Sequence, residues 1–141
     1  MRREVRVVAD TNVLISALLF GGLPEQILLA GLRGEIQLLT SIPILEELEN
    51  VLMKKFRLEP RLVKDSGDLV RDVAERVEVI SHLKVIKDPE GDNRVLECAV
   101  DGKADFVVSG DTKHILPLRE YEGIKILSPS DFVKLLPITI P

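Results

Sequence analysis

The chain has 141 residues with a formal net charge of −4, and 45% of its residues are hydrophobic. This length and composition predict one globular domain spanning residues 1–141, and the charge argues against a protein held on nucleic acid mainly by counterion release. The single cysteine, Cys98, excludes an internal disulfide and a zinc site made of several cysteines, and it fits a reduced, cytoplasmic setting. The longest mostly apolar run, Val13–Leu23, is shorter than the roughly 18 residues of a membrane-spanning helix, so we expect no membrane association.

Apolar periodicity and helix-starting residues predict that strands and helices follow one another along the chain. Pro24 and Pro60 each suit the first turn of a helix, where proline lacks no needed donor. In chain order, the first half is interpreted as a strand at 4–9, helices at 13–19 and from 24 to 31 or 34, a strand at 36–40, and helices at 41–56 and 60–77, the last with a possible break at Gly67. The second half is interpreted as a strand at 85–86, a turn at 87–91, a helix at 93–100, strands at 106–109 and 125–127, and a helix at 128–136.

Short strands that are apolar on both faces and alternate with helices predict a parallel sheet covered by helices. In such sheets, ligands bind outside the carboxyl ends of the strands. Asp10 ends the first strand, Asp111 follows the strand at 106–109, and Asp92 lies in the loop that enters the helix after the strand at 85–86. We therefore expect these three acids on one edge of the sheet.

The helix at 41–56 offers a fourth acid. Residues three and four apart are neighbours on a helix surface, and Glu47 is flanked in this way by Ile44 and Val51 of the apolar stripe. Glu46 lies on a more polar side, next to Glu49 and Asn50. Glu47 is therefore the better candidate to point toward the other acids.

Four carboxylates that converge need a proton or a cation. Two like charges about 4 Å apart repel by roughly 4 kcal/mol at an effective dielectric constant of about 20. Hard oxygen ligands select Mg²⁺ or Mn²⁺ over zinc, and such an ion can bind a phosphate oxygen and activate water. If the four acids converge, the sequence predicts metal-dependent hydrolysis of phosphodiesters.

Each acid also has a purely structural interpretation. Asp10 and Asp92 could serve only as N-caps of the helices that follow them, and Asp111 could simply make a turn with Gly110. The chain has 23 acidic residues, so some fall at loop ends by chance. The structural interpretation of all these acids together is weakened because three of them end or follow strands at the same predicted edge, so a shared site and separate structural roles both stay open at this point.

Four acidic motifs occur in order along nearly the whole chain. They are a strand ending in Asp10-Thr11-Asn12, then Thr40-Ser41 followed by Glu46-Glu47-Leu48, then Asp88-Pro89-Glu90-Gly91-Asp92-Asn93, then Ala104-Asp105-Phe106-Val107-Val108-Ser109-Gly110-Asp111. Together with a closing Ser128-Pro129-Ser130-Asp131-Phe132, this series resembles the PIN-domain family, in particular the subgroup of VapC-like toxin components of toxin–antitoxin pairs.

The resemblance implies a Rossmann-like three-layer α/β/α sandwich with a mostly parallel central sheet. It implies a Mg²⁺- or Mn²⁺-dependent ribonuclease that is often a homodimer and often inhibited by a small antitoxin protein. The implied catalytic and metal-binding residues are Asp10, Glu47, Asp92 and Asp111. Asn12 and Ser109 resemble supporting polar groups, and Asp105 is either a supporting acid or a polar start to its strand.

The chain departs from the family pattern after Asp111. Where relatives often carry another acid, this chain has Thr112-Lys113-His114, which leaves the affinity for a second metal ion open. Our hypothesis for the reaction is in-line attack of water on phosphorus with the 3′ oxygen leaving, which yields 5′-phosphate and 3′-hydroxyl ends. No 2′-hydroxyl takes part in this route, so cleavage of DNA stays chemically open.

Several other residues have two interpretations. His114 could contact the scissile phosphate, although a loop position at the rim is the more common case. Arg94 could orient substrate or pair with a site acid. A basic group could track an RNA backbone, although a solvated helix-end cluster is more common, and we expect no aromatic residue to interleave with it for base stacking. This group consists of Lys54, Lys55, Arg57, Arg61 and Lys64.

Three other functions compete with a toxin ribonuclease. A non-catalytic module that binds nucleic acid or protein would need none of the four acids, whereas the chain retains all of them. Phosphotransfer through Asp10 fits poorly, because Asn12 stands where such hydrolases want a general acid, and receiver domains want adjacent acids near the first strand. A ribonuclease that processes RNA without an antitoxin stays open.

Overall fold

The computed structural model describes residues 3–87 and 92–138 of the chain. Within them the elements run in the order β1 (Arg6–Ala9), α1 (Thr11–Leu19), α2 (Gly22–Leu32), β2 (Gln37–Thr40), α3 (Ile42–Lys54), α4 (Pro60–Val73), β3 (Glu75–Arg76), α5 (Asn93–Asp101), β4 (Phe106–Val108), the 3₁₀ helix η2 (Leu116–Leu118), β5 (Glu120–Tyr121), β6 (Ile124–Leu127) and α6 (Pro129–Val133). Residues 88–91, most of the predicted turn at 87–91, lie outside the described residues.

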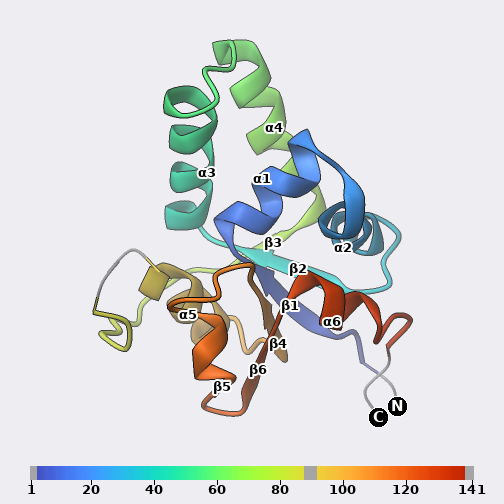
Figure 1. Ribbon diagram of the computed structural model, residues 1–141, viewed down its shortest axis with the longest axis vertical. Coiled ribbons are helices and arrows are strands. Elements are labelled where there is room, and N and C mark those ends of the chain that lie inside the picture. Colours follow the sequence, from blue (N-terminus) through green and yellow to red (C-terminus); the bar gives the residue numbers. More distant parts are fainter. Residues whose placement is uncertain (1–2, 88–91, 139–141) are drawn as a thin grey trace.

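The strands form one sheet with the spatial order β3-β2-β1-β4-β6-β5. Neighbouring strands are parallel, except that β5 and β6 are antiparallel. Helix α5 lies against one face of the sheet, and α1 to α4 gather on the other (Figure 1). The predicted α/β fold with a mostly parallel sheet between helices is therefore confirmed.

The central strands are buried because the sheet is covered on both faces. In β1, Val7, Val8 and Ala9 are buried, and in β4 the whole stretch Phe106–Val108 is buried. Such continuous apolar runs are typical of parallel strands between two layers of helices. Because β1 and β4 are neighbours, the residues that follow them leave the sheet side by side, and Asp10 N donates to the Val108 carbonyl at 3.0 Å.

Helices α3 and α4 form a hairpin that projects away from the sheet (Figure 1). Ser41 caps α3 by accepting a hydrogen bond from Ile44 N, and a proline stands in the first turn. The possible break at Gly67 does not occur, because α4 is continuous there. Gly67 instead permits close packing, since a Cβ at this position would lie 2.7 Å from Glu49 Oε1, the acceptor of an ion pair with Arg71 at 2.7 Å.

Two predicted elements are wrong in the region between α4 and α5. The predicted helix at 60–77 ends at Val73, because the chain then pairs with the edge of the sheet as β3 and Val77 N donates to the Thr40 carbonyl at 2.8 Å. Residues 85–86 are not a strand. The backbone groups of Ile86 are bound by a side chain, since Asn93 Oδ1 accepts from Ile86 N at 2.9 Å and Asn93 Nδ2 donates to its carbonyl at 2.6 Å.

The remaining differences lie at element ends and in the C-terminal third. The antiparallel strand β5 and the helix η2 were not expected, and α6 ends at Val133 rather than near Leu136. Cys98 lies in the core as predicted, and burial raises the pKa of its thiol to about 12. Among the described residues no single helix is long and apolar enough to cross a membrane, and α1 and α2 reach that length only as a pair bent by 96°.

Candidate active site

Asp10 lies where β1 ends and α1 begins, and its carboxylate does two jobs. Its Oδ1 accepts a hydrogen bond from Val13 N at 2.8 Å, which caps α1, so the capping interpretation is correct as far as it goes. Its Oδ2 accepts a hydrogen bond from the Ser109 hydroxyl at the end of β4. The side chain is buried, and burial raises its pKa; the two hydrogen bonds oppose that rise, and the charges of Asp111 and Glu47 add to it.

Asp111 follows β4 and is held by backbone amides. Its Oδ1 accepts from Lys113 N at 2.9 Å and from His114 N at 3.1 Å, and its own amide donates to Ser109 Oγ at 3.0 Å. The turn that the sequence suggested is therefore present. Burial alone would raise the pKa of Asp111, but these amide donors and the neighbouring Asp92 and His114 hold it below its ordinary value.

Asp92 stands at the N-cap position of α5 but its side chain makes no capping hydrogen bond, so the purely capping interpretation is wrong. Its Oδ2 is buried without a hydrogen-bond partner among the described residues. Burial raises the pKa of Asp92 to about 6, and its interaction with the Asp111 carboxyl and the charges of Asp111 and Glu47 contribute to the rise. Two ionised carboxylates cannot donate hydrogen bonds to one another, so a proton or a cation would relieve their repulsion.

Glu47 projects from α3 toward the same place. Its charge acts on the pKa values of both Asp10 and Asp92, so three different elements bring it and the aspartates within electrostatic reach of each other. Partial burial raises the pKa of Glu47, and the nearby Thr11 hydroxyl opposes this rise. The Thr11 hydroxyl makes no hydrogen bond of regular geometry among the described residues.

His114 joins this acidic cluster, which we define as Asp10, Glu47, Asp92, Asp111 and His114. One ligand atom from each of Asp92, Asp111 and His114 lies within 4.8 Å of the other two, a spacing that can hold a metal ion. His114 Nδ1 lies 3.3 Å from Asp111 Oδ2. The sequence had left two interpretations of His114, contact with the scissile phosphate or a loop position at the rim of the site, and it lies only three residues after Asp111.

Comparison with known proteins decides the family. The sequence model described as PIN domain matches residues 6–113. The chain belongs to the PIN-domain family. Comparison with curated proteins gave no match. PIN domains are generally metal-dependent nucleases, and the matched range contains four of the cluster's residues, Asp10, Glu47, Asp92 and Asp111.

The donor set of this PIN domain fits a divalent cation. The carboxylates supply hard oxygen atoms, and the buried Asp92 Oδ2 has a neighbouring carboxylate and no hydrogen-bond donor among the described residues. A cation would satisfy that oxygen and remove the repulsion that raises the pKa of Asp92. The structure thus shows a possible acidic metal-binding cluster at the carboxyl edge of the sheet.

The three supporting residues lie in different places. Ser109 is buried between Asp10 and Asp111 and hydrogen-bonds to both. Asn12 is exposed and lines an open pocket of about 450 Å³ together with Asp111. Asp105 stands at the opposite, amino end of β4, where it accepts hydrogen bonds from Arg3 at 2.6 Å and from Arg6 N at 2.8 Å, so it is a polar start to the strand there.

Two side chains on α5 that the sequence did not single out hold the chain that leads into Asp92. Glu97 is buried, accepts from Leu83 N at 2.9 Å and pairs with Arg94 at 2.9 Å. Asn93 binds Ile86 as described above. Arg94 therefore pairs with a structural acid rather than with the cluster. The available signal for Glu97 in the sequence was an acid placed between the apolar residues Leu96 and Cys98, one turn into the predicted helix.

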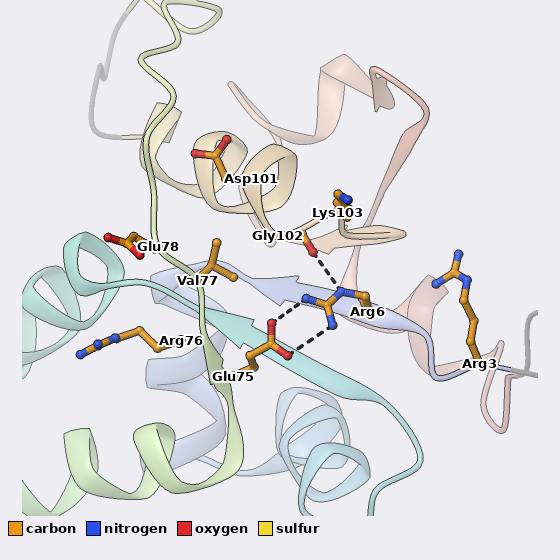
Figure 2. Close-up of a pocket in the computed structure, with 9 residues that line it drawn as sticks. All are labelled: Arg3, Arg6, Glu75, Arg76, Val77, Glu78, Asp101, Gly102 and Lys103. Carbon is orange, nitrogen blue, oxygen red and sulfur yellow. Dashed lines mark hydrogen bonds and ion pairs between the residues drawn. The ribbon is translucent and has the colours of Figure 1, made fainter.

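A larger pocket of about 680 Å³ lies at the opposite end of the sheet and is separate from the acidic cluster. Figure 2 shows Arg6 at its centre, donating to the Gly102 carbonyl at 2.9 Å and to Glu75 at 2.7 Å. The other cations that line it do not point toward Arg6 (Figure 2). We interpret the ion pair with Glu75 and the hydrogen bond to Gly102 as contacts that join β1 to β3 and to the end of α5.

Proposed function

We propose that this PIN domain is an endoribonuclease that hydrolyses RNA phosphodiesters with Mg²⁺ or Mn²⁺ at the acidic cluster. The observation that carries the proposal is the convergence of acids from separate places in the sequence. One ligand atom from each of Asp92, Asp111 and His114 lies within 4.8 Å of the other two. Ser109 hydrogen-bonds to both Asp10 and Asp111, and the charge of Glu47 acts on Asp10 and Asp92. A purely structural set of acids would each be satisfied by its own donors. Asp92 Oδ2 is not, within the described residues.

The chain's own residues divide the work at this site. Asp92 and Asp111 would hold the cation with His114 beside them, and Asp10 and Glu47 would complete the negative surroundings. When bound, the ion supplies a Lewis acid for a phosphate oxygen and lowers the pKa of a water molecule. Asp92 must first lose its proton, because a protonated carboxyl is a poor ligand.

Rigid support explains how these acids keep their positions. Ser109 fixes Asp10 relative to Asp111, and the amides of Lys113 and His114 fix the Asp111 carboxylate. Attack of water in line with the leaving 3′ oxygen would give 5′-phosphate and 3′-hydroxyl ends. The 2′-hydroxyl takes no part, so cyclic phosphate ends would contradict the proposed route.

Cleavage of a mixed pool of structured and single-stranded RNA tests this proposal. Wild type would be compared in Mg²⁺, Mn²⁺ and chelator with Glu47→Gln and with the matched control Glu46→Gln, which removes an exposed acid from the same helix. We expect metal-dependent cleavage in wild type and in Glu46→Gln, and a loss of at least about 100-fold in Glu47→Gln, the magnitude typical of removing an electrostatic group from an active site. Asp10→Asn should also lose activity.

Other outcomes would point to a different function. If wild type is inert although Mn²⁺ raises its melting temperature, the protein is a nuclease that needs a partner or a specific target. If no divalent ion stabilises the fold, the acids do not form a metal site, and a non-catalytic binding module becomes the better interpretation.

We further propose that the chain acts as the toxin of a toxin–antitoxin pair in the cytoplasm, as a homodimer. The support is the resemblance of its four ordered acidic motifs to that subgroup. Growth arrest on expression, abolished by Asp10→Asn and relieved by a neighbouring small gene, would support the toxin role. Normal growth with active enzyme present would favour an RNA-processing nuclease instead. Sedimentation of the purified chain tests the dimer.

A further inference from the structure

The far end of the α3–α4 hairpin carries a group of exposed cations that we call the basic tip: Lys54, Lys55, Arg57, Arg61 and Lys64. Of these five cations, only Lys64 forms an ion pair within the described part of the chain, with Asp68 at 3.1 Å. The segment 54–64 contains one acid, Glu59. A group of mostly unpaired cations on a protein of net charge −4 is a local positive field, which attracts polyanions.

Two aromatic side chains lie at the basic tip, so the expectation that no aromatic interleaves with the cations is wrong. Phe56 stands between Lys55 and Arg57 in the sequence, and Lys55 Nζ lies 5.6 Å from the centroid of its ring. Phe20, at the end of α1, packs edge-on against Phe56 with ring centroids 6.1 Å apart. Phe20 is 71% exposed, which leaves most of its ring available to another aromatic group.

The backbone holds this arrangement in an unusual conformation. Arg57 has φ +53°, in the left-handed region that favours glycine, just after α3 ends. Leu58 N donates to the Leu52 carbonyl at 3.1 Å, which fixes the turn around Arg57. A strained position occupied by a charged residue is a reason to look for function there.

Helices α3 and α1 both run from the acidic cluster toward the basic tip. Helix α3 carries Glu47 near its middle and Lys54 at its end, which are about 10 Å apart along the axis at 1.5 Å per residue. Helix α1 begins beside Asp10 and ends at Phe20, about 15 Å away by the same measure. A flexible strand of a few nucleotides can therefore reach from one surface to the other along these helices.

We propose that the basic tip, with Phe20 and Phe56, binds single-stranded RNA and presents it to the acidic cluster, an inference that rests on the proposed ribonuclease function. Cations that track phosphates and an exposed ring that stacks on a base are the two parts of a single-strand binding surface. A duplex is the poorer fit, because its bases are already stacked on one another. Stacking is tolerant of base identity, so the tip confers preference for unpaired strand rather than for a sequence.

Binding of a fluorescent single-stranded RNA in chelator tests the proposal, since no cleavage can occur there. The double variant Lys55→Ala/Arg57→Ala should bind at least about fivefold more weakly, and the slope of log affinity against log salt should fall by about 1.4, because each phosphate contact contributes about 0.7 for a single strand. The matched control Arg33→Ala/Lys84→Ala removes two exposed cations elsewhere, and its affinity should stay within twofold of wild type.

Stacking is tested separately at Phe20. We expect Phe20→Ala to weaken binding by at least about fivefold without changing the salt slope, since stacking involves no counterion. The control Leu32→Ala removes an exposed apolar side chain, 63% exposed, and should have no effect. The chain has no tryptophan, so Phe20→Trp introduces a single reporter whose fluorescence should be quenched by single-stranded RNA and much less by duplex of the same length.

The outcomes separate this inference from the proposed function. Unchanged affinity in both tip variants, or an equal loss in the controls, would overturn the RNA-binding role of the tip even if the protein cleaves RNA. Tryptophan fluorescence that single-stranded RNA does not quench in the Phe20→Trp protein would overturn stacking, and would leave the tip as a surface for an acidic protein partner. Specific binding through the tip in a protein that neither cleaves RNA nor is stabilised by a divalent ion would instead reject the nuclease and keep the RNA-binding role of the tip.

Discussion

Ser109 donates a hydrogen bond from its hydroxyl to Asp10 Oδ2, and the two residues come from the ends of neighbouring strands β4 and β1. The same hydroxyl oxygen accepts from Asp111 N at 3.0 Å. One small side chain therefore sets the separation of two acids of the cluster. Removing a group that orients a metal ligand in this way typically weakens metal binding or activity by about 10- to 100-fold.

We expect Ser109→Ala to weaken Mn²⁺ binding and RNA cleavage by roughly 10- to 100-fold, because Asp10 loses its donor and Asp111 loses its anchor. Calorimetric titration with Mn²⁺ measures the first effect. Ser128→Ala is the matched control, since Ser128 caps α6 by accepting from Asp131 N at 3.1 Å, away from the cluster. That control should lose about 1 kcal/mol of stability and keep its metal affinity. Equal metal binding in wild type and Ser109→Ala would show that Ser109 is only structural.

Burial of Asp92, together with repulsion from its acidic neighbours, predicts that Asp92→Asn stabilises the metal-free protein. The pKa of Asp92 is raised to about 6 in the folded chain, above its ordinary value, so the folded state holds the proton more tightly than the unfolded state. The resulting loss of stability builds up as pH rises from about 4 to about 6 and is complete above that range. The gain in melting temperature from Asp92→Asn should follow the same course.

Added Mn²⁺ should make the melting temperature of wild type higher than that of Asp92→Asn, the reverse of their order without metal. Wild type should gain melting temperature in Mn²⁺ at pH 7.5, whereas Asp92→Asn should not, because a neutral amide replaces a charged ligand. Thermal unfolding at pH 4 and 7.5, with Mn²⁺ and with chelator, gives the whole comparison. A lower melting temperature for Asp92→Asn in chelator at pH 7.5 would contradict the account of repulsion.

Asp105 should affect stability with the opposite dependence on pH. Burial would raise its pKa, but hydrogen bonds and charges from Arg3 and Arg6 hold it below the ordinary value. A lowered pKa means that the ion pair stabilises the fold above about pH 4 and that this contribution is lost as pH falls through the folded pKa. Asp105→Asn should therefore cost on the order of 1 kcal/mol at pH 7 and much less near pH 3.

The Asp105→Asn variant also tests whether the amino end of the sheet affects the acidic cluster at the carboxyl end. Asp105 lies at the amino end of β4 and the acidic cluster at its carboxyl end, so Asp105→Asn should keep Mn²⁺ affinity and RNA cleavage at temperatures where it is folded. Denaturant unfolding across pH, together with cleavage assays, checks both parts. Loss of metal binding in the folded variant would return Asp105 to the site.

The sequence predicted the parallel sheet and proposed the four site acids because both depend on local patterns of apolar and acidic residues. Apolar strands end in an acid at Asp10, and an apolar stripe beside Glu47 indicates which side of the helix faces inward. The strand β3 was missed because both of its residues are exposed and charged, so the sequence has no apolar pattern there. It forms only because this segment pairs with the edge of β2 in the folded chain. Likewise, Asn93 bonds to Ile86 through contacts that no periodicity records.

The basic tip was misjudged for a different reason. Phe56 stands directly between two cations and could have been noticed in the sequence. Phe20 lies 36 residues earlier, and only the fold brings the two rings together. Contacts between the ends of helices depend on helix length and crossing, which a one-dimensional pattern constrains weakly. For Asp92 the sequence left two interpretations, a site acid or only an N-cap, and the absence of a capping bond rules out the second.

Asn93 provides a final prediction, because it links the approach of the chain to the position of Asp92. The residue is buried, and its amide binds both backbone groups of Ile86, at 2.9 Å and 2.6 Å. Asn93→Ala would leave a buried N–H and a buried carbonyl without these partners, which costs about 1–3 kcal/mol for each group. We therefore expect a loss of a few kcal/mol in the free energy of unfolding, and weaker Mn²⁺ binding in the fraction that stays folded.

The matched control is Asn50→Ala, which removes an exposed amide from α3 and should change neither quantity. Urea unfolding measures stability, and titration with Mn²⁺ below the unfolding transition measures the site. Because Asn93 is the direct neighbour of Asp92, displacement of the segment at 83–86 should also move Asp92, whose Oδ2 has no hydrogen-bond donor within residues 3–87 and 92–138. If Asn93→Ala loses stability but binds Mn²⁺ as tightly as wild type, α5 alone positions Asp92, and the two hydrogen bonds between Asn93 and Ile86 stabilise only the fold.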